Sequence, residues 1–157
     1  MSENTVSVQT LLGGFSQAYG RYKIARNEKN NEKVFSALFE TLNWVVTIYF
    51  RLKDTNNKLS KNPLLKAIKY VRNHVHHQWA DALILSTKGM ALPAELPVAF
   101  HEWLWKSADN LPQGRIDPKG KRLYKDLLEN KPARYALQEV YTLFETIKDD
   151  NPTKSKN

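Results

Sequence analysis

The stretch from residue 32 to residue 53 constrains the fold most, because its apolar residues recur at every third or fourth position. This spacing is that of an α-helix with one broad apolar face, and such a face has to pack against other elements. Asn30 or Asn31 could cap the helix, and Glu32 lies in the first turn, where the helix dipole favours an acid. We therefore predict a central packing helix whose buried face consists of Val34, Phe35, Leu38, Phe39, Leu42, Val45, Val46, Tyr49 and Leu52.

Two other stretches have the same helical spacing. Residues 6 to 26 form one of them, although Gly13-Gly14 weakens the pattern and could kink or break the helix. The other opens at Asn62-Pro63, where asparagine suits the cap and proline suits the first helical position, and its pattern extends to about Thr87. The core face of this later helix should consist of Leu64, Ile68, Val71, Val75, Trp79 and Ala82.

Prolines and glycines punctuate the stretch around residues 88 to 120, so we expect an irregular connection there instead of long helices. Within it, Pro97 to Ala108 could be a short helix or an extended segment. Its large apolar side chains require burial and most simply fold this connection over the helices. The alternative is an aromatic platform on which unpaired bases stack. The residues concerned are Phe100, Trp103, Leu104 and Trp105.

Residues 121 to 149 return to helical spacing, so the whole pattern predicts an all-α protein, an antiparallel bundle of four to five helices. The 157 residues suit one domain, covering residues 1 to 149, and the polar residues 150 to 157 should form a disordered tail. The absence of cysteine excludes disulfides and thiolate nucleophiles. No apolar run approaches the roughly 20 residues that span a bilayer, and the N-terminus does not resemble a signal peptide, so we expect a cytoplasmic protein without a membrane partner.

Positive charge is concentrated in one part of the sequence. The net charge is +8, and the window from Arg51 to Arg72 contributes +6 of it, because seven basic residues there face one acid, Asp54. Such an excess raises the local concentration of a polyanion such as RNA. A solvated lysine-rich turn is the simpler alternative. The seven basic residues are Arg51, Lys53, Lys58, Lys61, Lys66, Lys69 and Arg72.

Three of the four histidines lie within four residues, at the end of this basic window. If the helix continues through them, a rotation of 100° per residue places the basic and histidine side chains on one strip beside the core face. Candidate chemistry and positive charge would then share a surface. The strip consists of Lys66, Lys69, Arg72, Asn73, His76 and His77.

On a continuous helix, residues four apart lie side by side on adjacent turns. Arg72 would then contact His76, and Asn73 would contact His77. Asp81, four residues after His77, could orient its imidazole. Two polar residues of the central helix could support the strip from behind, although solvent-facing positions are the simpler interpretation. These are Glu40 and Asn43.

The run Arg72-Asn73-His74-Val75-His76-His77 resembles the Arg-Asn-x-x-x-His motif of HEPN domains, which are small helical bundles. The motif covers only six residues, whereas the expected arrangement of helices resembles that family over most of the chain. The resemblance implies a HEPN-like bundle. It places Arg72, Asn73 and His77 at the motif positions.

Membership of this family implies a metal-independent endoribonuclease, commonly a toxin or an antiviral defence effector, in which two copies of the motif meet across a homodimer interface. No cofactor is implied. His77 would move protons near neutral pH, and Arg72 would hold a permanent positive charge beside the phosphate. Asn73 could hold the imidazole or a phosphate oxygen, and cleavage would leave a 2′,3′-cyclic phosphate. Lys66, Lys69 and His76 would bind the RNA.

One position departs from the pattern of a HEPN subgroup. In HEPN toxins paired with nucleotidyltransferase antitoxins, a tyrosine lies two residues after the motif histidine and is the residue that is modified. Here that position is Trp79. The resemblance therefore does not support neutralisation by tyrosine adenylylation, and it leaves open another antitoxin, a defence-system partner, or none.

Each histidine also has a simpler interpretation. His77 could be an ordinary surface histidine, and His74 and His76 could be spectators or dimer contacts. A zinc site on His74 and His77 is geometrically possible but lacks a nearby carboxylate or cysteine. The whole domain could equally be a catalytically inactive HEPN-like module that binds nucleic acid or a partner protein, or a regulatory subunit that uses the strip only to dimerise.

Overall fold

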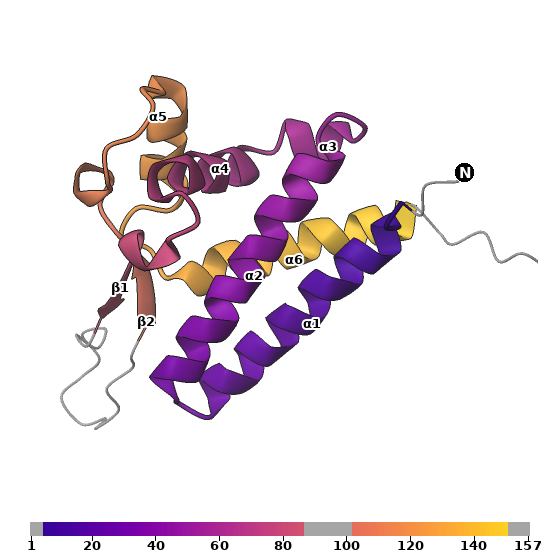
Figure 1. The fold of residues 1–157 in the computed structure, drawn as a ribbon, viewed down its shortest axis with the longest axis horizontal. Coiled ribbons are helices and arrows are strands. Elements are labelled where there is room, and N and C mark those ends of the chain that lie inside the picture. The colour runs from indigo at the N-terminus through magenta and orange to yellow at the C-terminus, as the bar shows by residue number, and fades with distance from the viewer. Residues whose placement is uncertain (1–4, 87–101, 151–157) are drawn as a thin grey trace, which may run out of the picture.

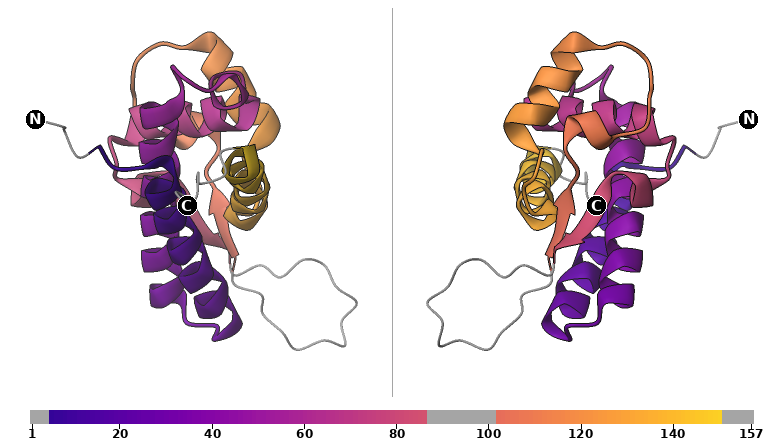
Figure 2. Two further views of the ribbon diagram at one scale, coloured as in Figure 1. Left: turned by 90° about the vertical axis from the view of Figure 1, so that its right-hand side faces the viewer. Right: turned by 90° about the vertical axis from the view of Figure 1, so that its left-hand side faces the viewer.

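The structure, a computed structural model, describes residues 5–86 and 102–150. Within these ranges it contains six α-helices and one two-stranded antiparallel sheet, so the prediction of a mostly helical bundle is confirmed, with a small hairpin added. Helices α1 (Val8–Asn27) and α2 (Asn31–Leu52) form an antiparallel pair, and α6 (Ala133–Asp150) crosses it (Figure 1). Figure 2 shows this pair on one side of the strands and α6 on the other.

Helix α1 is continuous through both of its adjacent glycines, so the helix is not broken there. It begins after Ser7, whose hydroxyl accepts the Thr10 N–H at 3.1 Å. A Cβ atom at Gly14 would overlap the ring of Trp44 on α2. The glycine therefore permits close packing of α1 on α2, and this packing offsets its low helix propensity.

Helix α2 is the central packing element that its spacing predicted. Asn30 caps it, accepting the Lys33 N–H at 3.1 Å. Nearly all of the predicted face is buried; Phe35 and Phe39 are only partly covered. The core lies between the α1–α2 pair and α6, where Phe15 and Phe144 meet edge to face with ring centroids 4.8 Å apart.

Helix α4 (Pro63–Val75) follows the single-turn helix α3 (Asn57–Ser60) and begins as predicted, with the Asn62 side chain accepting the Leu65 N–H at 3.0 Å. It ends far short of Thr87. After Val75 the chain turns, forms a 3₁₀ turn at Trp79–Asp81 and enters strand β1 (Leu83–Ser86). The predicted continuous helix is therefore wrong, because pairing with a distant strand overrides the local helical pattern.

Strand β1 pairs antiparallel with β2 (Glu102–Trp105), with Leu83 opposite Trp105 and Ser86 opposite Glu102. Trp105 is fully buried, and its ring centroid lies 6.4 Å from that of Trp79. Trp103 packs on Phe35, with their ring centroids 4.9 Å apart. The extended alternative thus holds for 102–105, and these two tryptophans pack inward instead of forming an open stacking platform. Phe100 lies outside the described residues.

Helix α5 (Pro118–Leu127) begins earlier than expected, after Asp117, whose carboxylate accepts the Gly120 N–H at 2.9 Å. It packs beside α4 (Figure 1). Helix α6 includes Asp150, which pairs with Lys58 at 2.5 Å, so that residue belongs to the folded domain. The rest of the predicted tail, 151–157, lies outside the described residues.

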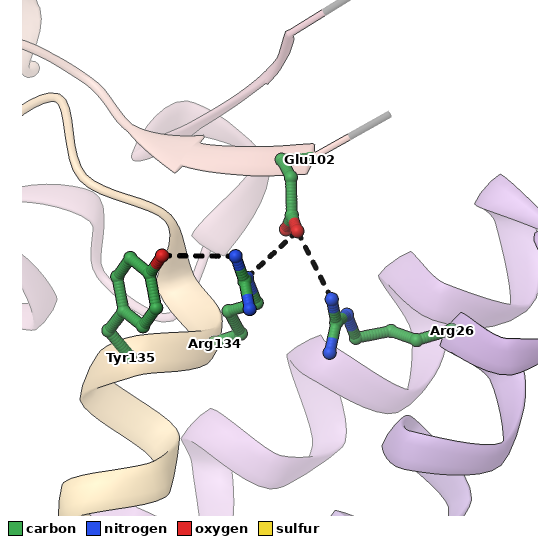
Figure 3. Close-up of polar contacts among 4 residues, drawn as sticks. All are labelled: Arg26, Glu102, Arg134 and Tyr135. Atoms are coloured by element: carbon green, nitrogen blue, oxygen red, sulfur yellow. Dashed lines mark hydrogen bonds and ion pairs between the residues drawn. The ribbon is translucent and has the colours of Figure 1, made fainter. Parts of the chain in front are cut away.

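A charged cluster fixes the hairpin between the helices, as Figure 3 shows. Glu102 on β2 lies 3.1 Å from Arg26 near the end of α1 and 2.8 Å from Arg134 in the first turn of α6. The Arg134 guanidinium also donates to the Tyr135 hydroxyl at 3.0 Å. One carboxylate thus links three elements that are distant in sequence.

None of the helices in the described part of the chain combines the length and the apolar character that a membrane crossing requires.

Candidate functional site

The turn that ends α4 has an unusual backbone. His76 and the next residue, His77, both have positive φ angles, 48° and 69°. A left-handed conformation costs a residue with a side chain about 1–2 kcal/mol, and helix ends usually use one glycine for it. Elsewhere among the described residues, Lys29 and Asn130 adopt it singly. Two consecutive cases point to a function for this turn, because such strain gathers at functional sites.

This turn brings His77 back onto Arg72. The Arg72 Nη2 atom lies 2.6 Å from His77 Nε2, and Arg72 Nη1 donates to Asn73 Oδ1 at 3.4 Å. On a continuous helix, residues five apart would point about 140° away from each other. The structure therefore joins all three motif side chains through the guanidinium. The expected neighbours, Arg72 with His76 and Asn73 with His77, are wrong because the helix ends between them.

The guanidinium of Arg72 rests on an aromatic ring from α2. Its Cζ atom lies 5.3 Å from the centroid of Phe50, and the Lys53 Nζ atom lies 5.4 Å from the same centroid. Attraction between a cation and the ring face orients both side chains. The spacing of residues in the sequence did not predict this contact. The available signal was Phe50 itself, a large aromatic residue that lies outside the apolar face of α2 and three residues before Lys53.

The surroundings of His77 favour its neutral form. Partial burial, the Arg72 guanidinium and the neighbouring His76, in that order, lower the pKa of the His77 imidazole from its usual value near 6.5. A guanidinium can only donate, so Nε2 accepts this hydrogen bond and the proton of the neutral ring is on Nδ1. His77 is thus a neutral base at physiological pH.

The residues expected to support the site divide into three cases. Asn43 accepts the indole N–H of the fully buried Trp79 at 2.9 Å, so it holds the chain just after the turn and does not touch the motif side chains. Glu40 pairs with Arg21 at 2.5 Å, away from the motif. Asp81 is exposed on the 3₁₀ turn and, within the described ranges, makes no side-chain contact with His77.

His74 is a core residue. It is 8% exposed, its Nδ1 atom lies 3.0 Å from the Tyr70 carbonyl oxygen, and its ring centroid lies 4.2 Å from that of Tyr70. Gly114 covers the other side so closely that a Cβ there would lie 2.9 Å from the ring. Its own chain therefore covers most of the His74 side chain. The described residues contain no group of three or more histidines, cysteines and acids that could hold a metal.

The basic part of the strip lies on α4 before the motif. Lys66 and Lys69 are half-buried, and His76 is exposed. None of these, nor Arg72, has a carboxylate partner among the residues that the structure describes. The strip is thus a surface of unneutralised positive charge.

Comparisons with known proteins add no relative: no family model, no curated protein and no solved structure matches this chain. The class of site is therefore defined by its own geometry, an arginine, an amide and a neutral imidazole joined at a strained turn beside a cationic surface.

Proposed function

We propose that this protein is a metal-independent endoribonuclease of the HEPN type that cleaves single-stranded RNA, and that it acts as a toxin or an antiviral defence effector. The observation that carries the proposal is the 2.6 Å contact between Arg72 and His77, made by a guanidinium without a carboxylate partner in the described part of the chain. Such a guanidinium is available to an anion.

The chemistry follows from the roles of the two groups. When a phosphodiester takes the Arg72 guanidinium, His77 Nε2 becomes free and accepts the proton of the 2′-hydroxyl. The 2′-oxygen attacks phosphorus, the bond to the 5′-oxygen breaks, and that oxygen takes up a proton from a second imidazole in its protonated form. Arg72 stabilises the negative charge that develops on the phosphate, and Asn73 keeps the guanidinium in place. The products are a 2′,3′-cyclic phosphate and a 5′-hydroxyl.

The reaction needs one group to accept a proton and another to donate one. A single chain offers one imidazole beside Arg72, because His74 is buried and His76 makes no described side-chain contact there. We therefore propose a homodimer in which two copies of the motif form one composite site. The two His77 side chains should then lie within about 10 Å, so that both can act on one phosphate.

The test is incubation of the purified protein with an unstructured RNA in EDTA. The wild type should cut the RNA and leave cyclic phosphate ends, whereas Arg72→Ala and His77→Ala should lose cleavage by a factor on the order of 10²–10⁴. Gln78→Ala is the matched control, because the side chain of this exposed neighbour makes no hydrogen bond with the residues that the structure describes. Intact RNA, or equal cleavage by His77→Ala, would remove the enzyme proposal.

One observation favours a second candidate, a catalytically inactive HEPN-like module that binds nucleic acid or a partner protein. The contact with Arg72 occupies the His77 lone pair that a base requires. An inactive module would retain RNA with an affinity that falls as salt rises, while the RNA stays intact. A subunit that uses the strip only to dimerise would instead lose its dimer mass in solution in the Arg72/His77 double alanine variant.

A further inference from the structure

We infer that Lys66, Lys69 and Lys119 form a separate binding site for one phosphodiester group of the RNA strand, next to the scissile phosphate. This inference rests on the proposed function. Lys119 belongs to α5, about fifty positions after the other two, and it was not part of the predicted strip.

The site is a small concavity between three helices. It has a volume of about 180 Å³ and is lined by residues of α2, α4 and the start of α5, among them Tyr49 and the three lysines. Pockets for drug-sized ligands occupy about 300–1,000 Å³. This volume therefore suits a phosphate group with a few waters, and it is too small for a whole nucleotide.

The charge of the concavity is positive. The only acid in its lining is Asp117, and one oxygen of that carboxylate already accepts the Gly120 N–H at the start of α5. Within the described ranges, none of the three lysines has an ion pair, whereas Lys58 pairs with Asp150 and Lys121 pairs with Asp109. Three lysines against one occupied carboxylate leave an excess that an anion can neutralise.

Close packing of α5 on α4 creates this grouping. A Cβ atom at Gly120 would lie 2.8 Å from the ring of Tyr70 on α4, so only glycine permits this approach. Lys119, the preceding residue, is thereby held beside the lysines of α4. The helices lie next to each other in Figure 1.

The lysines also lie at a useful spacing from the candidate reaction centre. Lys66, Lys69 and Arg72 follow one another at three-residue steps on α4, so Lys66 and Arg72 are about 9 Å apart along the helix axis and about 120° apart around it. A strand that winds partly around α4 can place one phosphate at Arg72 and a nearby phosphate in the concavity. Binding there would position the strand for cleavage without taking part in it.

The experiment measures binding separately from cleavage. A fluorescent, fully 2′-O-methylated single-stranded RNA cannot be cleaved by 2′-oxygen attack, so its dissociation constant reports binding alone. Lys119→Ala should weaken binding about three- to tenfold and reduce the slope of log affinity against log salt by about 0.7. Lys125 is a basic residue at the other end of α5 that does not line the concavity, so Lys125→Ala is the matched control. It should change the dissociation constant and the salt slope less than Lys119→Ala does.

Each outcome has a defined meaning. Equal affinities for Lys119→Ala and Lys125→Ala would overturn the inference, as would a Lys119→Gln variant with wild-type affinity and salt slope. A titration with inorganic phosphate, monitored by the NMR signal of the Gly120 amide, distinguishes a site for free phosphate from a site for RNA. If the signal shifts but Lys119→Ala does not weaken RNA binding, the concavity binds free phosphate only, and the inference is overturned. If the wild type leaves a cleavable RNA intact but Lys119→Ala weakens binding of the methylated RNA, the nuclease proposal alone fails. If the wild type cuts RNA but Lys119→Ala binds the methylated RNA as the wild type does, the phosphate site alone fails.

Discussion

Arg26 and Arg134 share the carboxylate of Glu102, at 3.1 and 2.8 Å. Among the residues that the structure describes, the Arg72 guanidinium contacts instead an imidazole, an amide and an aromatic ring, and no carboxylate. The first arrangement neutralises its cations and links three elements (Figure 3). The second leaves its guanidinium positive at a half-exposed position. Removing the carboxylate from the first arrangement would leave two largely covered cations unpaired, whereas the second arrangement leaves its cation available to an anionic ligand.

Replacing Arg72 by lysine should have the largest effect on function. Arg72→Lys keeps the charge but loses the planar fork that contacts both Asn73 and His77. We expect RNA cleavage to fall by roughly 100-fold, while the free energy of unfolding changes by less than about 0.5 kcal/mol. Cleavage assays and denaturant unfolding measure the two. If Arg72→Lys instead lost much stability and kept its cleavage activity, Arg72 would serve the fold and not the binding of an anion.

Removing the shared carboxylate should act on stability instead. Glu102→Gln leaves Arg26 and Arg134 without a negative partner in a mostly buried cluster, so the free energy of unfolding should fall by about 2 kcal/mol. For a chain of this length the melting temperature should fall by about 4–8 °C. Glu28→Gln, which removes an exposed pair with Lys33, is the control and should cost less than about 1 kcal/mol. Equal effects would show that the cluster has no special role.

The strained turn offers a smaller change of opposite sign. His76→Gly should raise the free energy of unfolding by about 0.5–1 kcal/mol, because glycine adopts the φ of 48° without the steric cost that histidine has. His76→Ala retains the Cβ atom and should show no gain. Thermal unfolding measures both variants. A destabilised glycine variant would mean that the His76 side chain stabilises the turn.

The smallest expected effect is a shift in one titration. The NMR midpoint of His77 should lie below 6.5, and it should rise in Arg72→Gln but stay lowered in part, since burial is the larger cause. Because the unfolded chain takes up this proton first, stability should decrease as the pH falls from about 6.5 through the folded-state midpoint. Cleavage should decrease over the same interval. A midpoint above 6.5 in the wild type would contradict the neutral-base role.

The sequence by itself determined which faces of α2 and α4 are buried and where these two helices begin. All six residues predicted for the core face between Leu64 and Ala82 are buried, and Asn30 and Asn62 cap their helices as predicted. These features depend on residues within a few positions of one another, so local spacing is enough to find them. Arg72, Asn73 and His77 were singled out by the resemblance to the HEPN motif, and the structure shows that Arg72 contacts both of the others.

Only the tertiary structure decided how those motif residues meet. Periodicity reports burial and not backbone conformation, so Trp79 reaches the core although α4 ends at Val75. Pairing of 83–86 with 102–105 drives that turn, and no local pattern encodes it. The same holds for Phe50 beneath Arg72, for Glu40 turned toward Arg21, and for Lys119 beside α4. Each depends on contacts between segments far apart in the chain, which come together only when the whole core packs.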